Sequence, residues 1–137
     1  MTIRTTVILI ILTLIFAVVF FYFLNQNSKI AELAVTQDPV YISKTQKVFT
    51  DKDKDIYLFI KLNKVKKGEN LKISWFKNTE DAGKTLIQES NIITQEKGSG
   101  FVKISLLNKN DRYENGSYEL SVSLNKNTER SLEFKIE

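Results

Sequence analysis

Cysteine and histidine are both absent from this sequence of 137 residues, and proline occurs once, at Pro39. Without cysteine the chain can form no disulfide, zinc-thiolate site or lipid-modified Cys, and it has no thiol nucleophile. Without histidine it lacks the side chain most often used as a general base near neutral pH. The five glycines form no phosphate-binding loop or nucleophile elbow. We therefore expect neither an enzyme nor a cofactor-binding protein.

Arginine is scarce after Arg4, with only Arg112 and Arg130 in the rest of the chain. The formal net charge is +4, and residues 25–137 carry 19 basic and 16 acidic side chains once Arg4 is left out. A nucleic-acid-binding protein normally concentrates a stronger basic stripe with aromatic residues among it. The composition therefore predicts no nucleic-acid partner.

One long apolar segment runs from Thr5 to Leu24 without a charge, glycine or proline. Its 20 residues would form about 30 Å of helix, which matches the hydrocarbon core of a bilayer. A cleaved signal peptide has a shorter apolar region, about 7–15 residues, followed by a small-x-small site. This segment instead ends in the bulky run Phe20 to Leu24. We therefore expect residues 1–24 to be an uncleaved membrane anchor, with Tyr22 near the interface.

The orientation of this anchor depends on few charges: Arg4 and the terminal amine on one flank, and Lys29 on the other. Because a long polar portion follows the anchor, we expect a cytoplasmic N-terminus and an extracytoplasmic C-terminal domain on a cell membrane. Type IV pilins share the order of apolar helix and β domain, but their Gly before the apolar run and Glu at its fifth position are missing here. A homo-oligomeric filament subunit, with the helix in the fibre core, is thus the second hypothesis.

Residues 25–39 read NQNSKIAELAVTQDP and separate the anchor from the rest of the chain. Ile30, Leu33 and Ala34 keep one-face helical spacing. We expect a linker here, with a helical extension to about Ala34 left open, and a stop at Pro39. The domain is then expected to occupy residues 40–137.

After position 40 apolar residues recur at every second position, as they do in half-buried strands. A weak first strand is expected in YISKTQKVF, residues 41–49, and one or two edge strands between Leu86 and Ile93. The clearest inward-facing sets lie within residues 56–62, 71–75, 102–106, 118–124 and 132–136. About seven short strands without an amphipathic helix predict an all-β fold, an antiparallel β-sandwich.

The stretch ENGSYEL, residues 114–120, resembles the immunoglobulin-superfamily motif D-x-G-x-Y-x-C at the turn into strand F. In that motif the tyrosine hydroxyl bonds back to the backbone, and the glycine allows a tight turn. Trp75 stands where strand C carries its core tryptophan, and Ile60 stands in for the strand B cysteine. The resemblance implies a Cys-free Ig-like or fibronectin-like module of prokaryotic membrane-anchored surface proteins, with structural roles for Trp75, Gly116 and Tyr118. A generic turn and strand would explain the last two residues as well.

Four lysines lie close together in the sequence around the expected turn at Gly68: Lys61, Lys64, Lys66 and Lys67. In Ig topology the B–C and F–G loops lie at the end where strand A begins, and here strand A is tethered to the membrane. These lysines, with Lys126 and Arg130 of the F–G loop, are thus expected to face the membrane surface or an acidic partner. An ordinary solvated loop would carry the same charges.

Two further patterns are compatible with a site. Asp51, Asp53 and Asp55 alternate like the start of a calcium loop, but Ile56 and Leu62 occupy the EF-hand positions for Gly and Glu. We assign no metal site and keep these three residues as a weak candidate beside a solvated loop. The sequence Asn115-Gly116-Ser117 fits a glycosylation acceptor and also a turn.

Together these observations predict a single-pass membrane protein whose extracytoplasmic domain works by binding. The first hypothesis is an accessory subunit of a cell-envelope complex, with other envelope proteins as partners. Sandwich edges and loops are suited to strand addition and to flat protein contacts.

Overall fold

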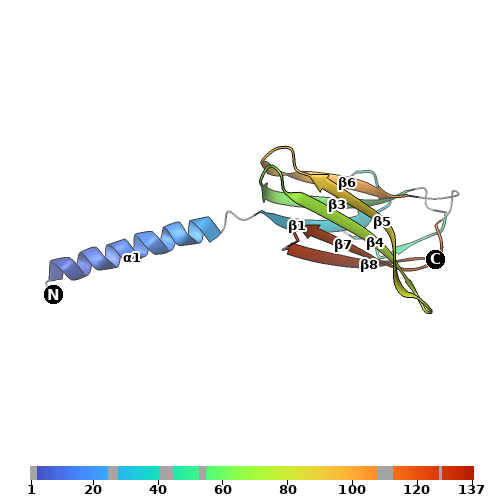
Figure 1. The fold of residues 1–137 in the computed structure, drawn as a ribbon, viewed down its shortest axis with the longest axis horizontal. Coiled ribbons are helices and arrows are strands. Elements are labelled where there is room, and N and C mark those ends of the chain that lie inside the picture. Colours follow the sequence, from blue (N-terminus) through green and yellow to red (C-terminus); the bar gives the residue numbers. More distant parts are fainter. Residues whose placement is uncertain (1–2, 25–27, 41–44, 53–54, 108–112, 127) are drawn as a thin grey trace.

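The computed structural model describes residues 3–24, 28–40, 45–52, 55–107, 113–126 and 128–137. Helix α1 (Ile3–Leu24) projects away from the β-strands, as Figure 1 shows. Its segment Ile3–Phe23 is long and apolar enough to cross a membrane, and none of that segment is buried against the rest of the chain. The Thr13 hydroxyl donates to the Leu9 carbonyl at 2.8 Å, which satisfies this polar group within the helix itself.

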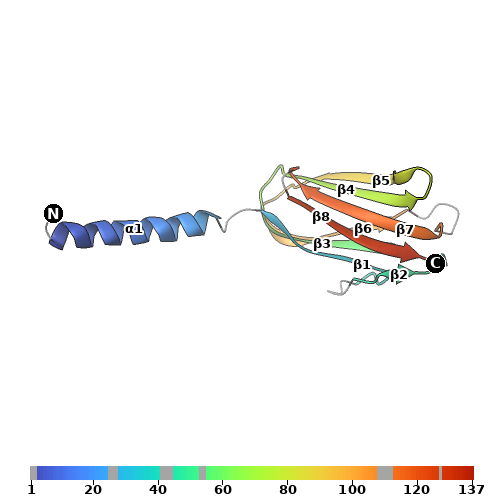
Figure 2. The same ribbon diagram turned by 90° about the horizontal axis from the view of Figure 1, so that it is seen from below.

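The rest of the described chain forms two sheets packed face to face (Figures 1 and 2). The three-stranded sheet has the order β1 (Lys29–Thr36), β3 (Ile56–Val65), β6 (Gly98–Leu106). The five-stranded sheet has the order β2 (Val48–Phe49), β8 (Thr128–Ile136), β7 (Gly116–Leu124), β4 (Asn70–Thr79), β5 (Gly83–Ile93). The expected β-rich, sandwich-like architecture after an apolar helix is confirmed.

Two details of that expectation were wrong. The described residues form eight strands where about seven were expected, and the sheets are not purely antiparallel because β2 pairs with β8 in parallel. β1 and β2 run in the same direction but belong to different sheets, so the chain between them crosses from one sheet to the other. β2 therefore meets β8, which runs the same way. Of the weak first strand expected at 41–49, only Val48–Phe49 is a strand, and residues 41–44 lie outside the described part.

The segment treated as a linker contains a strand. β1 occupies Lys29–Thr36, so neither the helical extension to Ala34 nor a domain start at residue 40 is correct. The register of β1 against β3 shifts between Ile30 and Glu32, which marks a β-bulge. A bulge adds one residue and so places Ile30 on the same side as Leu33, three positions later. That spacing is indistinguishable from a helical one in the sequence.

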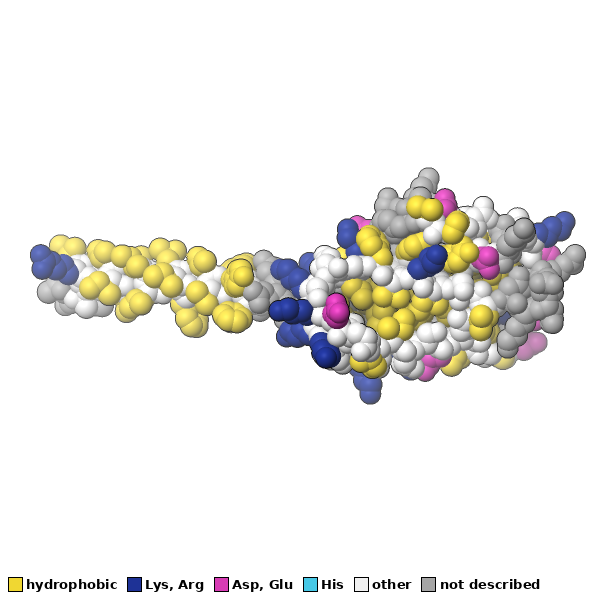
Figure 3. Space-filling view, turned by 90° about the horizontal axis from the view of Figure 1, so that it is seen from above, with side chains coloured by type: hydrophobic (Ala, Val, Ile, Leu, Met, Phe, Trp, Pro, Cys, Tyr) yellow, Lys and Arg dark blue, Asp and Glu magenta, His cyan; other side chains and the backbone are white. Residues whose placement is uncertain are grey.

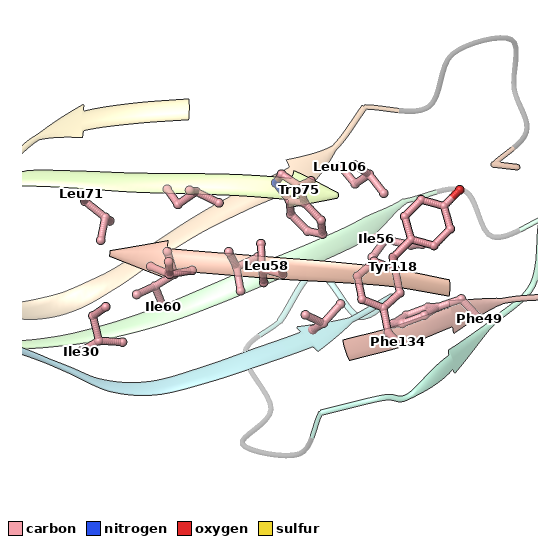
Figure 4. Close-up of a cluster of buried hydrophobic side chains, with 14 of the residues drawn as sticks. Ile30, Phe49, Ile56, Leu58, Ile60, Leu71, Trp75, Leu106, Tyr118 and Phe134 are labelled. Carbon is pink, nitrogen blue, oxygen red and sulfur yellow. The ribbon is translucent and has the colours of Figure 1, made fainter. Parts of the chain in front are cut away.

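The core lies between the two sheets (Figure 4). The inward-facing sets expected from the alternation are the ones that meet there, and Trp75 and Ile60 are fully buried. Phe134 on β8 is the centre of an aromatic group, with ring centroids 5.3 Å from Tyr118, 5.5 Å from Phe49 and 6.1 Å from Trp75. Each large side chain buried in this way contributes about 1.5–3 kcal/mol.

Where one or two edge strands were expected between Leu86 and Ile93, the structure has one long edge strand, β5, which forms a hairpin with β4. β5 and β6 are the last strands of their sheets. The side chain of Gln88 on β5 bridges toward β6: its amide nitrogen donates to the Ser105 carbonyl at 3.1 Å, and it accepts from the Leu107 N–H at 2.9 Å. One amide therefore connects the two sheets along their open side.

Candidate functional site

The turns at one end of the sandwich lie next to the start of β1 and therefore closest to α1 (Figure 1). β1 begins at Lys29, opposite Asn63 near the end of β3, and the β3–β4, β5–β6 and β7–β8 connections lie at the same end. This helix-proximal end comprises the β3–β4 turn (66–69), the β5–β6 turn (94–97) and the described part of the β7–β8 turn (125–126). The opposite, distal end carries the C-terminus.

Exposed lysines gather at the helix-proximal end, where Figure 3 shows several dark blue side chains between α1 and the body of the sandwich. Three of the four lysines expected from the sequence belong to this group. The others come from strand β1 and from the two remaining turns. We call this set the lysine collar: Lys29, Lys64, Lys66, Lys67, Lys97 and Lys126.

Two basic residues expected in the turns lie elsewhere. Lys61 is inside β3, with its ammonium 3.7 Å from the Glu32 carboxylate and 5.9 Å from the centre of the Phe101 ring. Arg130 is inside β8, and its guanidinium donates to the carbonyls of Ile30 at 3.3 Å and Ala31 at 2.9 Å. Both strands extend further toward the turns than the sequence pattern suggested, because alternating polar residues continue them.

A buried carboxylate lies beneath the collar. Glu69 is only 8% exposed and accepts three hydrogen bonds, from the Ser28 hydroxyl (2.5 Å), the Lys66 N–H (2.8 Å) and the Asn125 amide (3.0 Å). A buried carboxylate needs several donors to offset its desolvation. Glu69 therefore joins the residue before β1 to the β3–β4 and β7–β8 turns.

Thr94 and Asn125 complete this network. The Thr94 hydroxyl accepts from the Glu69 N–H at 2.9 Å and donates to the Lys66 carbonyl at 2.5 Å, which adds the β5–β6 turn. The Asn125 side chain accepts from the Asn70 N–H at 2.8 Å. The three turns that carry Lys66, Lys67, Lys97 and Lys126 are thus held together by specific polar contacts.

The residues of the Ig-like motif lie at the distal end. The Tyr118 hydroxyl donates to the Glu114 carbonyl at 2.5 Å, the contact that the motif implies. Burial, and secondarily the nearby Glu114 carboxylate, raise the pKa of Tyr118 to about 12. Gly116 has φ +145°, and a Cβ there would meet the Lys77 side chain at 3.3 Å. Hydrogen bonding to Lys77 lowers the pKa of Glu114.

The aspartate cluster has only two members in the described part of the chain, because Asp53 lies outside it. Asp55 accepts from the Tyr57 hydroxyl at 3.2 Å, and the Asp51 N–H donates to the Glu137 carbonyl at 3.0 Å. Among the described residues no group of three or more acidic side chains could hold a metal ion. Asn115 is exposed, just before β7.

Two residues with important contacts were not found from the sequence. Glu69 looks like a solvated charge in the lysine-rich turn, and its partners are distant in the chain. Tyr113 is buried, and its hydroxyl accepts from the Ile56 N–H at 3.2 Å and donates to the Leu106 carbonyl at 3.1 Å. The only sequence signal that could have suggested this second tyrosine–backbone contact, after that of Tyr118, is a tyrosine in a polar loop.

No protein-family model and no curated protein sequence matches this chain. Among solved structures, the C-terminal domain of wzt is similar with a TM-score of 0.53 and 15% identity, over 80% of this chain and 73% of that one. The β-glucosidase EmGH1 from Erythrobacter marinus has a TM-score of 0.54 and 6% identity, and covers 81% of this chain. A β-glucosidase from Listeria innocua in complex with isofagomine has a TM-score of 0.50 and 12% identity, and covers 80% of this chain.

The chain spans only 15% and 16% of the two glucosidases. At these identities the similarity shows a β-sandwich-like fold alone. It carries no information about activity.

Proposed function

We propose that this protein is a single-pass membrane-anchored interaction module, with its sandwich outside the cytoplasm, and that it serves as an accessory subunit of a cell-envelope complex. The observation that carries the proposal is α1, an apolar helix whose membrane-length segment has no burial against its own sandwich. Exposed apolar side chains around a whole helix are stable in lipid or against other apolar helices, and not in water.

We further propose that the sandwich is an Ig-like module. Support comes from the Tyr118 bond to a carbonyl four residues upstream and from the burial of Trp75 against Phe134. The passage from β1 in one sheet to β2 in the other fits the same architecture. Such modules work through flat faces, loops and strand edges, which agrees with a binding role.

The test is gentle extraction of a C-terminally tagged copy from its own membranes, followed by native mass measurement and identification of the chains in the assembly. We expect a discrete, stoichiometric assembly that contains other membrane proteins. Protease should remove the tag from intact cells, because the C-terminus is extracytoplasmic. A matched variant, in which α1 is replaced by an unrelated apolar helix of equal length, should remain in the membrane and lose the assembly if α1 packs specifically.

Four outcomes would contradict this function. Recovery of the chain in the soluble fraction without detergent would show that α1 does not anchor it in the membrane. A tag protected in intact cells reverses the orientation. A homopolymer favours the filament subunit, and a lone monomer excludes the accessory subunit.

A further inference from the structure

The lysine collar is held close to the end of the apolar helix. α1 ends at Leu24, and Ser28 follows after four peptide steps, which extend over at most about 14 Å. The Ser28 hydroxyl donates to Glu69 in the β3–β4 turn at 2.5 Å. The turn that carries Lys66 and Lys67 therefore lies near the end of α1, whatever path the chain takes between Leu24 and Ser28.

This distance matches the headgroup layer of a membrane. The polar headgroups add about 5–8 Å beyond the hydrocarbon core on each side. Ser28, within about 14 Å of the end of the spanning helix, is then within roughly one Debye length, about 8 Å, of that layer. Its contact with Glu69 places the turn that carries Lys66 and Lys67 beside it. Each basic residue near an anionic membrane surface increases binding by about fivefold in favourable cases.

Three of the collar lysines, Lys66, Lys67 and Lys126, have no carboxylate partner within the described part of the sandwich. Other lysines have carboxylate partners, such as Lys72 with Glu89 at 3.2 Å. The collar turns contain the carboxylates of Glu69 and Glu96, whereas six carboxylates lie at the distal end: Asp51, Asp55, Glu80, Asp81, Glu114 and Glu137. The sandwich is therefore electrostatically polarised along the direction that leads away from α1.

Two collar lysines also occupy unfavourable backbone positions. Lys64 has φ +54° and Lys126 has φ +63°. Glycine is the residue that adopts such left-handed conformations without strain, and Asn tolerates them better than other residues. At both positions glycine would remove the backbone strain, but lysine places a positive charge at this end of the sandwich.

We propose that the lysine collar docks on anionic phospholipid headgroups of the leaflet that faces the sandwich. The domain then rests on the bilayer with its acidic distal end directed away from it. This inference rests on the proposed function, in which α1 anchors the chain. An acidic protein surface is the competing occupant, and the experiment separates the two.

The experiment uses the full chain in lipid nanodiscs made of phosphatidylcholine alone or mixed with phosphatidylglycerol. Because the chain has no cysteine, a fluorophore attached through Gln95→Cys labels the exposed β5–β6 turn alone. A second preparation, labelled through Asp81→Cys, reports the distal end. The measured quantity is quenching of the fluorophore by a dye on the lipid headgroups. Both leaflets carry the anionic lipid, so the result does not depend on orientation.

We expect quenching of the Gln95 label to be about fivefold stronger or more in anionic discs, with no change at Asp81. The difference should disappear between about 0.01 M and about 1 M salt, as the Debye length falls from about 30 Å to about 3 Å. This salt titration uses no charge variant and so needs no assumption about the folding of altered chains.

A charge-reversal pair then assigns the effect to the collar. The collar variant combines Lys66→Glu, Lys67→Glu, Lys97→Glu and Lys126→Glu, and should lose the response to anionic lipid. The control makes the same charge change at four exposed lysines elsewhere, and should keep it: Lys47, Lys52, Lys103 and Lys135.

Three results would overturn the proposal. Equal quenching in neutral and anionic discs, with the chain inserted, leaves the anchor intact but excludes lipid docking; the collar is then available to an acidic protein. If the collar variant and the control variant lose the response to anionic lipid equally, the response depends on net charge and not on the position of the collar. A chain that does not enter the discs contradicts the proposed function and this inference together.

Discussion

At the helix-proximal end of the sandwich one buried carboxylate joins several turns, whereas at the distal end two separate tyrosine hydroxyls, those of Tyr113 and Tyr118, bond to the backbone. Glu69 accepts from three donors, which come from three separate parts of the chain. Tyr118 bonds to a carbonyl four residues away in the sequence, whereas Tyr113 bonds to a carbonyl seven residues away and to the Ile56 N–H, 57 residues away. The proximal end is thus held by one shared acceptor and the distal end by two separate hydroxyls. Loss of one group should therefore cost more at the proximal end.

Glu69→Ala tests this difference most strongly. It leaves the donors of Ser28, Lys66 and Asn125 without their acceptor, and we expect a loss of about 3 kcal/mol in the free energy of unfolding. Urea denaturation of the detergent-solubilised chain measures it, with the fluorescence of Trp75, the only tryptophan, as the signal from the sandwich core. Glu96→Ala, at an exposed site in the neighbouring turn, should change stability by less than about 0.5 kcal/mol. Similar values for the two variants would refute the role of Glu69.

Tyr113→Phe should have the next largest effect, about 2 kcal/mol. It removes a hydroxyl that satisfies both the buried Ile56 N–H and the Leu106 carbonyl. Tyr57→Phe is the matched control, because its hydroxyl bonds to the exposed Asp55 carboxylate and water can replace it. The same urea denaturation measures the effect. If Tyr113→Phe lowers the free energy of unfolding no more than Tyr57→Phe does, the Tyr113 hydroxyl does not stabilise the fold.

Tyr118→Phe should cost about 1 kcal/mol at neutral pH, since one hydrogen bond is lost. The pKa of Tyr118 is raised from 10.0 to about 12 in the folded protein, so folding favours the neutral phenol. Its stabilising contribution is complete below pH 10 and is lost as the pH rises from 10 to 12. The difference in unfolding free energy between the original chain and Tyr118→Phe should therefore decrease over this range. A difference that stays constant up to pH 12 would show that the hydroxyl ionises equally easily in both states.

Lys126→Gly is expected to have the smallest effect and the opposite sign. Glycine relieves the left-handed backbone at φ +63°, partly offset by the greater freedom that it gives the unfolded chain, so we expect a gain of about 0.5 kcal/mol. Lys97→Gly is the control: Lys97 is not among the described residues with positive φ, so this variant should gain nothing. A destabilising effect of Lys126→Gly would show that the left-handed backbone at Lys126 does not lower the stability of the folded chain.

Much of the fold follows from local alternation. The inward-facing residues of β3, β4, β7 and β8 could be assigned because one face of each strand is apolar and the other polar, with no irregularity in most of them. The inward-facing residues of β1 could not be assigned in this way, because the bulge after Ile30 gives its apolar residues a helix-like spacing. Its partner strand begins 20 residues later in the chain, and pairing at that range leaves no local signal.

The candidate site was predictable only in part. Lys64, Lys66 and Lys67 are neighbours in the sequence, so their clustering is visible without a structure. Lys97 and Lys126 join them only because the β5–β6 and β7–β8 turns lie at the same end of the sandwich. Glu69 illustrates the limit best: its burial depends on Ser28 and Asn125, which are 41 and 56 residues away.

No strand of the described part of the chain pairs with the outer edges of β5 and β6, and the membrane anchor limits how these edges can pair with another copy. Unpaired edges invite pairing between identical chains, and antiparallel pairing is the slightly more stable form. β5 runs from the distal to the helix-proximal end of the sandwich. Two copies anchored in one membrane have their helix-proximal ends at the same surface, so their β5 strands run in the same direction and cannot pair antiparallel. Antiparallel pairing of β5 with β5 therefore requires copies on two membranes that face each other. Within one membrane, β5 can instead pair antiparallel with β6 of a neighbouring copy, because β6 runs from the helix-proximal to the distal end.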